Sequence, residues 1–172
     1  MELDCCFHPP DFLICKQELH VYADASSTAI GHVIYCRTIS HSKVVHVTFV
    51  SGGSRVAPRA VSTIQRLELC AAMEFCQTLV KTTNELRRNL DDVFYYTDSK
   101  IVLGYLTNSS RRFSNYVVRR VNNIFRLFSV DRWNDVCNTE NPADLASRPH
   151  PGGKDLFLGY SFDIFNIPSL SP

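Results

Sequence analysis

The sequence predicts an α/β domain built on a mixed β-sheet that is flanked by helices. The order of its segments is the first reason: three successive stretches suit β-strands, a long amphipathic stretch follows, and shorter strands and helices come after it. The composition is the second reason, because 172 residues that are 45% hydrophobic and 20% charged suit one globular domain with a real core.

The first strand is expected at residues 19–24, where apolar side chains alternate with polar or aromatic ones. Residues 1–18 show no clear period and are expected to form an irregular lead-in. The domain is then expected to span residues 19–148. Residues 149–172, which are rich in proline, glycine and aromatic residues, are expected to form an irregular, partly docked C-terminal extension.

Two further strands are expected at residues 30–37 and 43–50, joined by short turns that contain serine and histidine. Consecutive strands with short connections predict an antiparallel meander. The run Ser51-Gly52-Gly53-Ser54 is expected to end the third strand, because glycine and serine favour turns.

A long helix is expected from Thr63 to about Glu85. The residues Ser62-Thr63-Ile64-Gln65 suit a capping box, in which the serine and glutamine side chains satisfy backbone donors at the start of the helix.

The rest of the chain predicts two more strands and three more helices. Residues 91–98 are aromatic and β-branched, which favours a strand, and residues 133–137 are expected to form the last strand. Helices are expected at residues 99–108 and 113–128. Asn141-Pro142 suits the start of a final short helix that ends near Ser147.

The composition excludes several classes of function. With 18 basic and 17 acidic residues the net charge is +1, so any basic surface for nucleic acid must be local. Seven cysteines without a C-x-x-C pair indicate neither a disulfide framework nor a zinc site, and buried thiols are expected. Glu2 and Asp4 precede any apolar run, and no long apolar stretch follows. We therefore expect an intracellular protein without membrane contact, located in the cytoplasm or alternatively in the nucleus.

Glu68 is the most informative residue of the long helix, because it is expected to face the core. It lies two positions after Arg66, about 200° around a helix, so it points away from the polar side. An unpaired carboxylate is costly to bury, which means that it is usually paired, protonated or bound to a cation. A buried glutamate–arginine ion pair is the alternative. The apolar rows on this side are Leu67, Ala71, Phe75 and Leu79, and Ile64, Ala72 and Cys76.

Three other acids stand at the ends of expected elements. Asp24 closes the first strand and Asp98 closes the fourth, while Asp144 lies in the first turn of the last helix. Each alone could serve as a helix cap or interact with a helix dipole. Together with Glu68 they could meet at one edge of the sheet, and clustered carboxylates are tolerated chiefly when a metal neutralises them. Oxygen ligands of this kind suit Mg²⁺ and two-metal hydrolysis of phosphodiesters.

Four motifs around these acids occur in a characteristic order. They are Y-A-D-A-S, R-L-E-L-C-A-A, Y-Y-T-D-S-K-I-V-L-G-Y-L and N-P-A-D-L-A-S-R. In this combination the chain resembles the ribonuclease H domain of retrotransposon polyproteins, most closely the BEL/Pao group, from about His20 to Arg148. The resemblance implies a ribonuclease H-like fold with a five-stranded mixed sheet, three strands antiparallel and two added in parallel.

The resemblance also implies a site and an activity. Asp24, Glu68, Asp98 and Asp144 take the positions of the metal ligands and hold two Mg²⁺ ions, with Mn²⁺ as a possible substitute. The implied reaction is endonucleolytic cutting of the RNA strand of RNA–DNA hybrids. The implied partners are an RNA–DNA hybrid and the reverse transcriptase and integrase regions of a parent polyprotein. Many relatives carry a histidine before the last acid, whereas this chain has Cys137-Asn138-Thr139-Glu140-Asn141.

Substrate contacts are expected from a positive helix and from polar residues near the acids. Arg112, Arg119 and Arg126 recur every seven residues beside Arg111, Arg120 and Arg132, and no acid lies between Arg111 and Val130. Arg112 and Arg119 are predicted to contact phosphates, although a solvated charged face is the alternative. The other predicted substrate-binding residues are Ser26, Ser99 and Asn115.

Three hypotheses remain open from the sequence. The first is an active ribonuclease that cuts RNA–DNA hybrids, which the complete set of four acids favours. The second is a catalytically inactive nucleic-acid-binding or interaction module derived from a retroelement, which the absent loop histidine favours. The third is a strand-transferring or DNA-cleaving enzyme of the wider superfamily, which the glutamate in the R-L-E-L motif disfavours.

Overall fold

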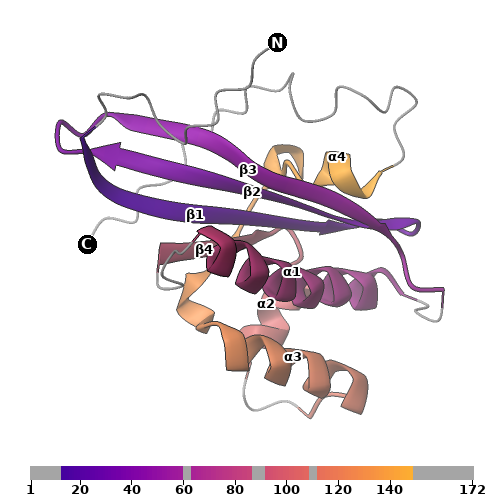
Figure 1. Cartoon of the computed structure of the whole chain (residues 1–172). Coiled ribbons are helices and arrows are strands. Elements are labelled where there is room, and N and C mark those ends of the chain that lie inside the picture. The colour runs from indigo at the N-terminus through magenta and orange to yellow at the C-terminus, as the bar shows by residue number, and fades with distance from the viewer. Residues whose placement is uncertain (1–12, 60–62, 87–91, 109–111, 149–172) are drawn as a thin grey trace.

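Residues 13–59, 63–86, 92–108 and 112–148 are described in the computed structural model (Figure 1). Five strands form one mixed sheet in the order β3-β2-β1-β4-β5, with β1, β2 and β3 antiparallel and with β4 and β5 added in parallel. This arrangement confirms the expected fold class. The strands are β1 (Ile14–Ala25), β2 (Ala29–Ser40), β3 (Val45–Val56), β4 (Val93–Thr97) and β5 (Trp133–Asp135).

Helices cover both faces of the sheet. Three of them lie on one side, and the short α4 lies on the other (Figure 1). These helices are α1 (Ile64–Leu86), α2 (Lys100–Thr107), α3 (Asn115–Leu127) and α4 (Asp144–Ser147). Two 3-10 turns, Val130–Arg132 and Asn138–Glu140, flank β5. In the described part of the chain, no helix is long and apolar enough to cross a membrane.

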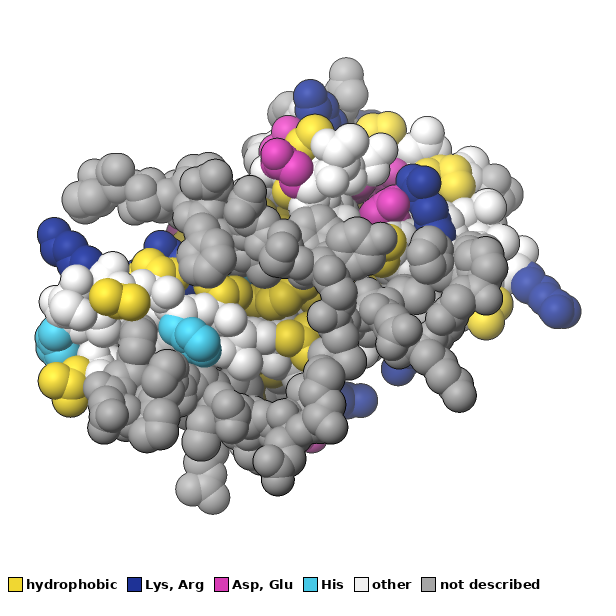
Figure 2. Space-filling view, turned by 90° about the horizontal axis from the view of Figure 1, so that it is seen from above, with side chains coloured by type: hydrophobic (Ala, Val, Ile, Leu, Met, Phe, Trp, Pro, Cys, Tyr) yellow, Lys and Arg dark blue, Asp and Glu magenta, His cyan; other side chains and the backbone are white. Residues whose placement is uncertain are grey.

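The alternation along β1 divides the interior into two layers. Leu19 and Val21 face α1 and join the main core, whereas Tyr22 packs with Val33 and Tyr96 on the other side. Hydrophobic side chains are visible along the middle of this second face (Figure 2). Most of the apolar residues expected on the inner side of α1 are buried, but Ile64 is exposed. The fully buried members of the main core include Leu69, Leu79, Val93, Val102 and Ile124.

Two expected boundaries of the sheet are wrong. The lead-in expected over residues 1–18 ends earlier, because β1 begins at Ile14 and pairs with β2 from there. The run Ser51-Gly52-Gly53-Ser54 does not end the third strand, since β3 continues to Val56 after a register shift. Gly53 allows close packing within the sheet and does not form a turn, since a Cβ atom at this position would lie 2.8 Å from Cε1 of His32.

Other expected elements are found with shifted ends, and some residues named above lie outside the described part. The last helix begins at Asp144, three residues after the expected cap. Asn141 instead accepts a hydrogen bond from the amide of Ala143 (3.1 Å) and donates one to the carbonyl of Ala23 (2.9 Å).

Several predicted features lie outside the described residues and are not tested by the structure. They are most of the lead-in, Ser62 of the capping box, Asp91, Arg111 and the extension over 149–172.

Candidate active site

The parallel pairing of β1 with β4 brings Asp24 and Asp98 to the same edge of the sheet. Ala23 of β1 pairs with Thr97 of β4, and each of these residues is followed directly by one of the two aspartates. Both are half-buried. Burial raises the pKa of Asp98, and the charges of Asp24 and Asp144 raise it further, while a hydrogen bond from Asn141 acts in the opposite sense.

Glu68, on the second turn of α1, turns its carboxylate toward this edge. The Ser99 hydroxyl donates a hydrogen bond of 2.5 Å to Oε2 of Glu68, and it also caps α2 by accepting from the amide of Val102. Burial raises the pKa of Glu68; the Ser99 hydrogen bond lowers it, and the charges of Asp98 and Asp24 raise it again. The expectation that this acid points inward is confirmed, since its side chain is half-buried.

The alternative of a buried ion pair does not apply to Glu68. Among the described residues, Glu68 forms no ion pair with a basic side chain. Asp98 likewise does not cap α2, because Ser99 does so. Among the described residues, a buried glutamate does pair with an arginine in the first half of β1, where Glu18 meets Arg37.

Asp144 completes the group from the other side of the sheet. It is the first residue of α4, and its Oδ1 lies 2.7 Å from Nη2 of Arg148. Burial raises the pKa of Asp144, Arg148 lowers it, and the charge of Asp24 raises it. The charge of Asp24 raises the pKa values of Glu68, Asp98 and Asp144, so these three acids all lie near Asp24.

Ser147 joins α4 to the end of β1, and sequence analysis missed it. Its side chain is fully buried, and its hydroxyl donates to Oδ2 of Asp24 and to the carbonyl of Asp144. Its own carbonyl accepts from the Ser26 hydroxyl at 2.6 Å. A Cβ atom on Gly31 would lie 2.5 Å from the Ser147 amide nitrogen, so α4 rests directly on β2 at a position that only glycine can occupy. The serine of the N-P-A-D-L-A-S-R motif was the available signal.

The donor chemistry of these acids suits a hard divalent cation. A cation would relieve the mutual repulsion that raises the pKa values of Glu68 and Asp98. However, no three histidine, cysteine, aspartate or glutamate residues in the described ranges are arranged as a finished metal site. One carboxylate oxygen each of Glu68, Asp24 and Asp144 is instead engaged, by Ser99, Ser147 and Arg148 respectively.

The predicted substrate-binding residues differ in what they offer. The hydroxyls of Ser26 and Ser99 already donate within the protein, to Ser147 and to Glu68. By contrast, Asn115, Arg112 and Arg119 are exposed, although Arg112 lies before α3 rather than within it. Three aromatic residues of β1 and β4 are buried in the sheet: Tyr22, Tyr95 and Tyr96.

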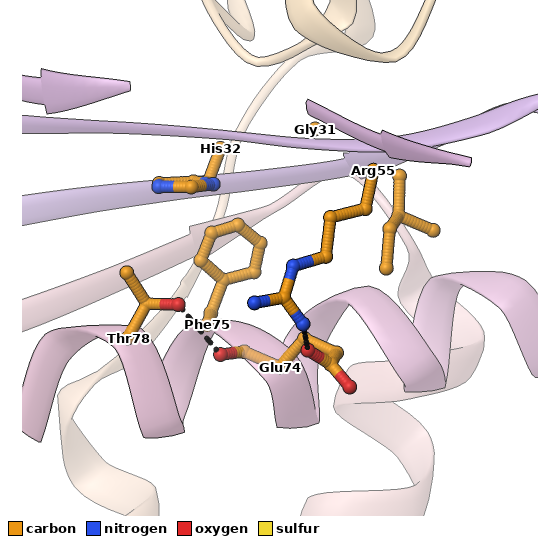
Figure 3. A pocket seen from close by; sticks show the side chains of 7 residues that line it. Gly31, His32, Arg55, Glu74, Phe75 and Thr78 are labelled. Carbon is orange, nitrogen blue, oxygen red and sulfur yellow. Dashed lines mark hydrogen bonds and ion pairs between the residues drawn. The ribbon is translucent and has the colours of Figure 1, made fainter. Parts of the chain in front are cut away.

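A small hollow between α1 and strands β2 and β3 is separate from the acids (Figure 3). Arg55 spans it with an ion pair of 2.6 Å to Glu74, and the ring of His32 meets Phe75 edge-on at 4.9 Å. Burial and the Arg55 charge lower the pKa of His32. The one carboxylate of this hollow, that of Glu74, is paired with Arg55 and is therefore not free to bind a metal.

Comparison with known sequences now assigns the family. The profile of the Pao retrotransposon-like RNaseH-like domain matches residues 10–99, which is just over half of the 172-residue chain. The chain belongs to this family. The matched part of this Pao-type domain contains Asp24, Glu68 and Asp98 and ends before Asp144. No curated protein matches the chain by sequence.

Solved structures resemble this Pao-type domain in fold. The N-terminal RNase H domain of a Mycobacterium tuberculosis protein has a TM-score of 0.50 at 13% identity, covering 76% of this chain and 91% of its own. RNase H1 from Halobacterium salinarum has a TM-score of 0.48 at 16% identity, with 76% and 92% covered. LC11-RNase H1 in complex with an RNA/DNA hybrid has a TM-score of 0.49 at 12% identity, with 76% and 93% covered. At these identities the mycobacterial likeness supports the RNase H-like fold alone.

Proposed function

We propose that this domain is a ribonuclease that hydrolyses the RNA strand of RNA–DNA hybrids. The observation that carries the proposal is the gathering of Asp24, Glu68 and Asp98 at one edge of the sheet, with Asp144 beside them. In the described residues the first three form no ion pair with a basic side chain. Acids that repel one another without a basic partner suit a site for divalent cations. Membership in a retrotransposon family supports RNA–DNA hybrids as the substrate.

The four acids would hold two Mg²⁺ ions, or Mn²⁺ in their place. When bound, such ions supply an activated water and stabilise the leaving oxygen at phosphorus. The residues of the chain provide the orientation. The strand ends fix Asp24 and Asp98, the Ser147 hydroxyl orients Asp24, and the hydrogen bond from Ser99 favours the ionised form of Glu68.

The substrate would be held by exposed groups outside this edge. Arg112, Arg119 and Asn115 remain the proposed contacts to phosphates or to ribose 2′-hydroxyls. Ser26 and Ser99 would reach the substrate only by giving up hydrogen bonds within the protein. Their hydroxyls already donate internally, and they also accept from the backbone amides of Ala29 and Val102. In a parent polyprotein, the reverse transcriptase region would supply the hybrid.

The test is incubation of the purified chain with an end-labelled RNA–DNA hybrid and Mg²⁺ or Mn²⁺, beside an Asp98→Asn variant. We expect the parent to cut the RNA strand, leaving a 3′-hydroxyl, and the variant to leave it intact. A DNA duplex and a single-stranded RNA of the same sequence serve as specificity controls. Binding of the hybrid without any cutting by the parent would refute the proposal.

That outcome would favour a second function, an inactive nucleic-acid-binding or interaction module. One observation supports this alternative: Arg148 forms an ion pair with Asp144 and so competes with any cation for this carboxylate. An Arg148→Gln variant separates the two functions. It should strengthen Mn²⁺ binding, measured by electron paramagnetic resonance, if the acids hold metal, and it should change nothing if they do not.

A further inference from the structure

The sheet face that carries α4 is lined by aromatic rings from four strands, β4, β1, β2 and β3. Neighbouring rings lie 4.7–6.1 Å apart between centroids, so they form a continuous row across the sheet. Hydrophobic side chains line the middle of this face (Figure 2). We refer to this group as the aromatic layer, and its members are His20, Tyr22, Tyr35, Phe49, Phe94 and Tyr96.

The described part of the chain covers the aromatic layer at one end. Helix α4, which is about 6 Å long, rests on Gly31, and Gly31 pairs with Asp24 at the end of β1. His20 stands four residues before Asp24, about 13 Å further along the strand. The side chain of His20 is nevertheless buried, with 2% of its surface exposed. An apolar sheet face has to be covered by a second layer, so a further segment is needed over this part of the aromatic layer.

The C-terminal tail, residues 149–172, lies outside the described residues, but its sequence contains a pattern typical of a strand. Apolar side chains occupy every second position from 156 to 164, which places all five on one side of an extended segment. Proline and glycine at 149–153 and proline at 168 bound this stretch. The five residues are Leu156, Leu158, Tyr160, Phe162 and Ile164, and between them stand Phe157, Gly159, Ser161 and Asp163.

The tail starts on the correct face and is long enough to cross it. It follows α4, which lies on the side of the aromatic layer (Figure 1). The stretch from Arg148 to Leu156 can span up to about 26 Å, and the five alternating side chains extend over about 26 Å more. The four strands of the aromatic layer are only about 14 Å apart from first to last. The lead-in offers a smaller apolar surface, because its two phenylalanines, Phe7 and Phe12, are separated by two prolines.

We propose that residues 156–164 lie as an extended segment across the aromatic layer, with their five alternating apolar side chains facing it. The occupant of this face is therefore a segment of the same chain. Docking removes apolar surface of both the tail and the sheet from water. It also holds α4, and with it Asp144, against β2. The proposal does not depend on whether the domain cuts nucleic acid.

The first test compares two phenylalanines of the tail in the full chain. Phe162→Ser removes a side chain that faces the sheet and should lower the melting temperature by about 5 °C or more, because it leaves a cavity over the aromatic layer. Phe157→Ser makes the same change on the opposite side of the segment and should shift the melting temperature by about 1 °C or less. Equal shifts in the two variants would refute the proposal. A large loss in Phe7→Ser but not in Phe162→Ser would also overturn it, in favour of the lead-in.

A photo-crosslink tests the same contact even if Phe162→Ser does not fold. With p-benzoylphenylalanine in place of Phe162, irradiation should join the tail to peptides of the same chain that contain Tyr22, Tyr35 or Tyr96, as identified by mass spectrometry. The same group in place of Phe157 should not form these products. Products that join two chains would show that a second copy covers the face, and products with α1 or α3 would place the tail elsewhere; either result would contradict the proposal.

Discussion

Both halves of β1 carry an acid, but the surroundings of the two acids differ: basic groups surround Glu18, whereas other acids lie near Asp24. Near its start, the buried Glu18 lies 2.8 Å from Nη1 of Arg37, 2.7 Å from Nζ of Lys16 and 3.3 Å from Nε2 of His20. Burial alone would raise the pKa of Glu18, but these hydrogen bonds hold it well below its ordinary value. At the other end, Asp24 meets further acids and hydroxyl groups.

The difference teaches how to distinguish a structural acid from a functional one within the same strand. Glu18 is surrounded by donors and cations, so its charge contributes to stability. Glu68 and Asp98 have pKa values raised by burial and by neighbouring carboxylates, of which Asp24 acts on both, so their charges oppose folding. Charge repulsion that the fold itself does not relieve indicates a site kept for a ligand.

The largest expected effect is the loss of activity in Glu68→Gln. The amide can still accept the hydrogen bond from Ser99, but it cannot supply the negative charge that a cation needs. We expect cleavage of the hybrid to fall by about three orders of magnitude, or about 4 kcal/mol in the barrier. We also expect the free energy of unfolding to stay constant or to rise, measured by urea denaturation without metal. Cleavage at the parent's rate would mean that Glu68 is not a metal ligand.

The matched change at the other end, Glu18→Gln, should have the opposite result. It removes the negative charge that Arg37, Lys16 and His20 share and leaves one amide oxygen as an acceptor, which should lower the free energy of unfolding by about 3 kcal/mol. Cleavage per folded molecule should not change, because Glu18 lies far from the acid edge along β1. A variant as stable as the parent would contradict the structural role assigned to Glu18.

Part of the pH dependence of stability should come from His20, beside Glu18, and it should lower the stability as the pH falls. Burial lowers the pKa of His20, and the charges of Arg37 and Lys16 lower it further, whereas the hydrogen bond to Glu18 raises it. The other ring nitrogen of His20, Nδ1, contacts the Tyr96 hydroxyl. His20 is therefore neutral in the fold while the unfolded chain takes up a proton near pH 6.5. This contribution to stability is complete above pH 6.5 and is lost as the pH falls, at up to about 1.4 kcal/mol per pH unit.

Chemical denaturation of the parent and of His20→Gln between pH 7.5 and 5 would measure this slope. The variant should show a shallower dependence, and the slope that remains should come in part from His32, whose pKa is also lowered. Parallel curves for the two proteins would show that His20 does not titrate differently on folding.

The smallest expected effect belongs to Ser147→Ala at the acid edge. Loss of its hydrogen bond to Asp24 should lower stability by about 1 kcal/mol and should raise the Mg²⁺ concentration needed for half-maximal cleavage. Ser129→Ala is the matched control, because the Ser129 hydroxyl also bonds an aspartate, Asp131, but at an exposed site. An unchanged Mg²⁺ requirement in Ser147→Ala would limit this serine to a role in packing.

Much of the candidate site was predictable because local patterns mark it. Strand ends placed Asp24 and Asp98, and helix periodicity showed that Glu68 points inward. The network around Glu18 was also visible in principle, since Lys16, Glu18 and His20 alternate along one strand. It was missed because β1 was expected to begin at Leu19.

The sequence by itself therefore determined the order of the elements, the family and the residue types that could bind metal. These follow from periodicity and from motifs whose members are neighbours along the chain. The tertiary structure alone decided that β3 continues through Gly52 and Gly53, that α4 rests on Gly31, and that Ser147 bonds Asp24. Such contacts join residues distant in sequence, and only the packing of strands and helices determines which side chains meet.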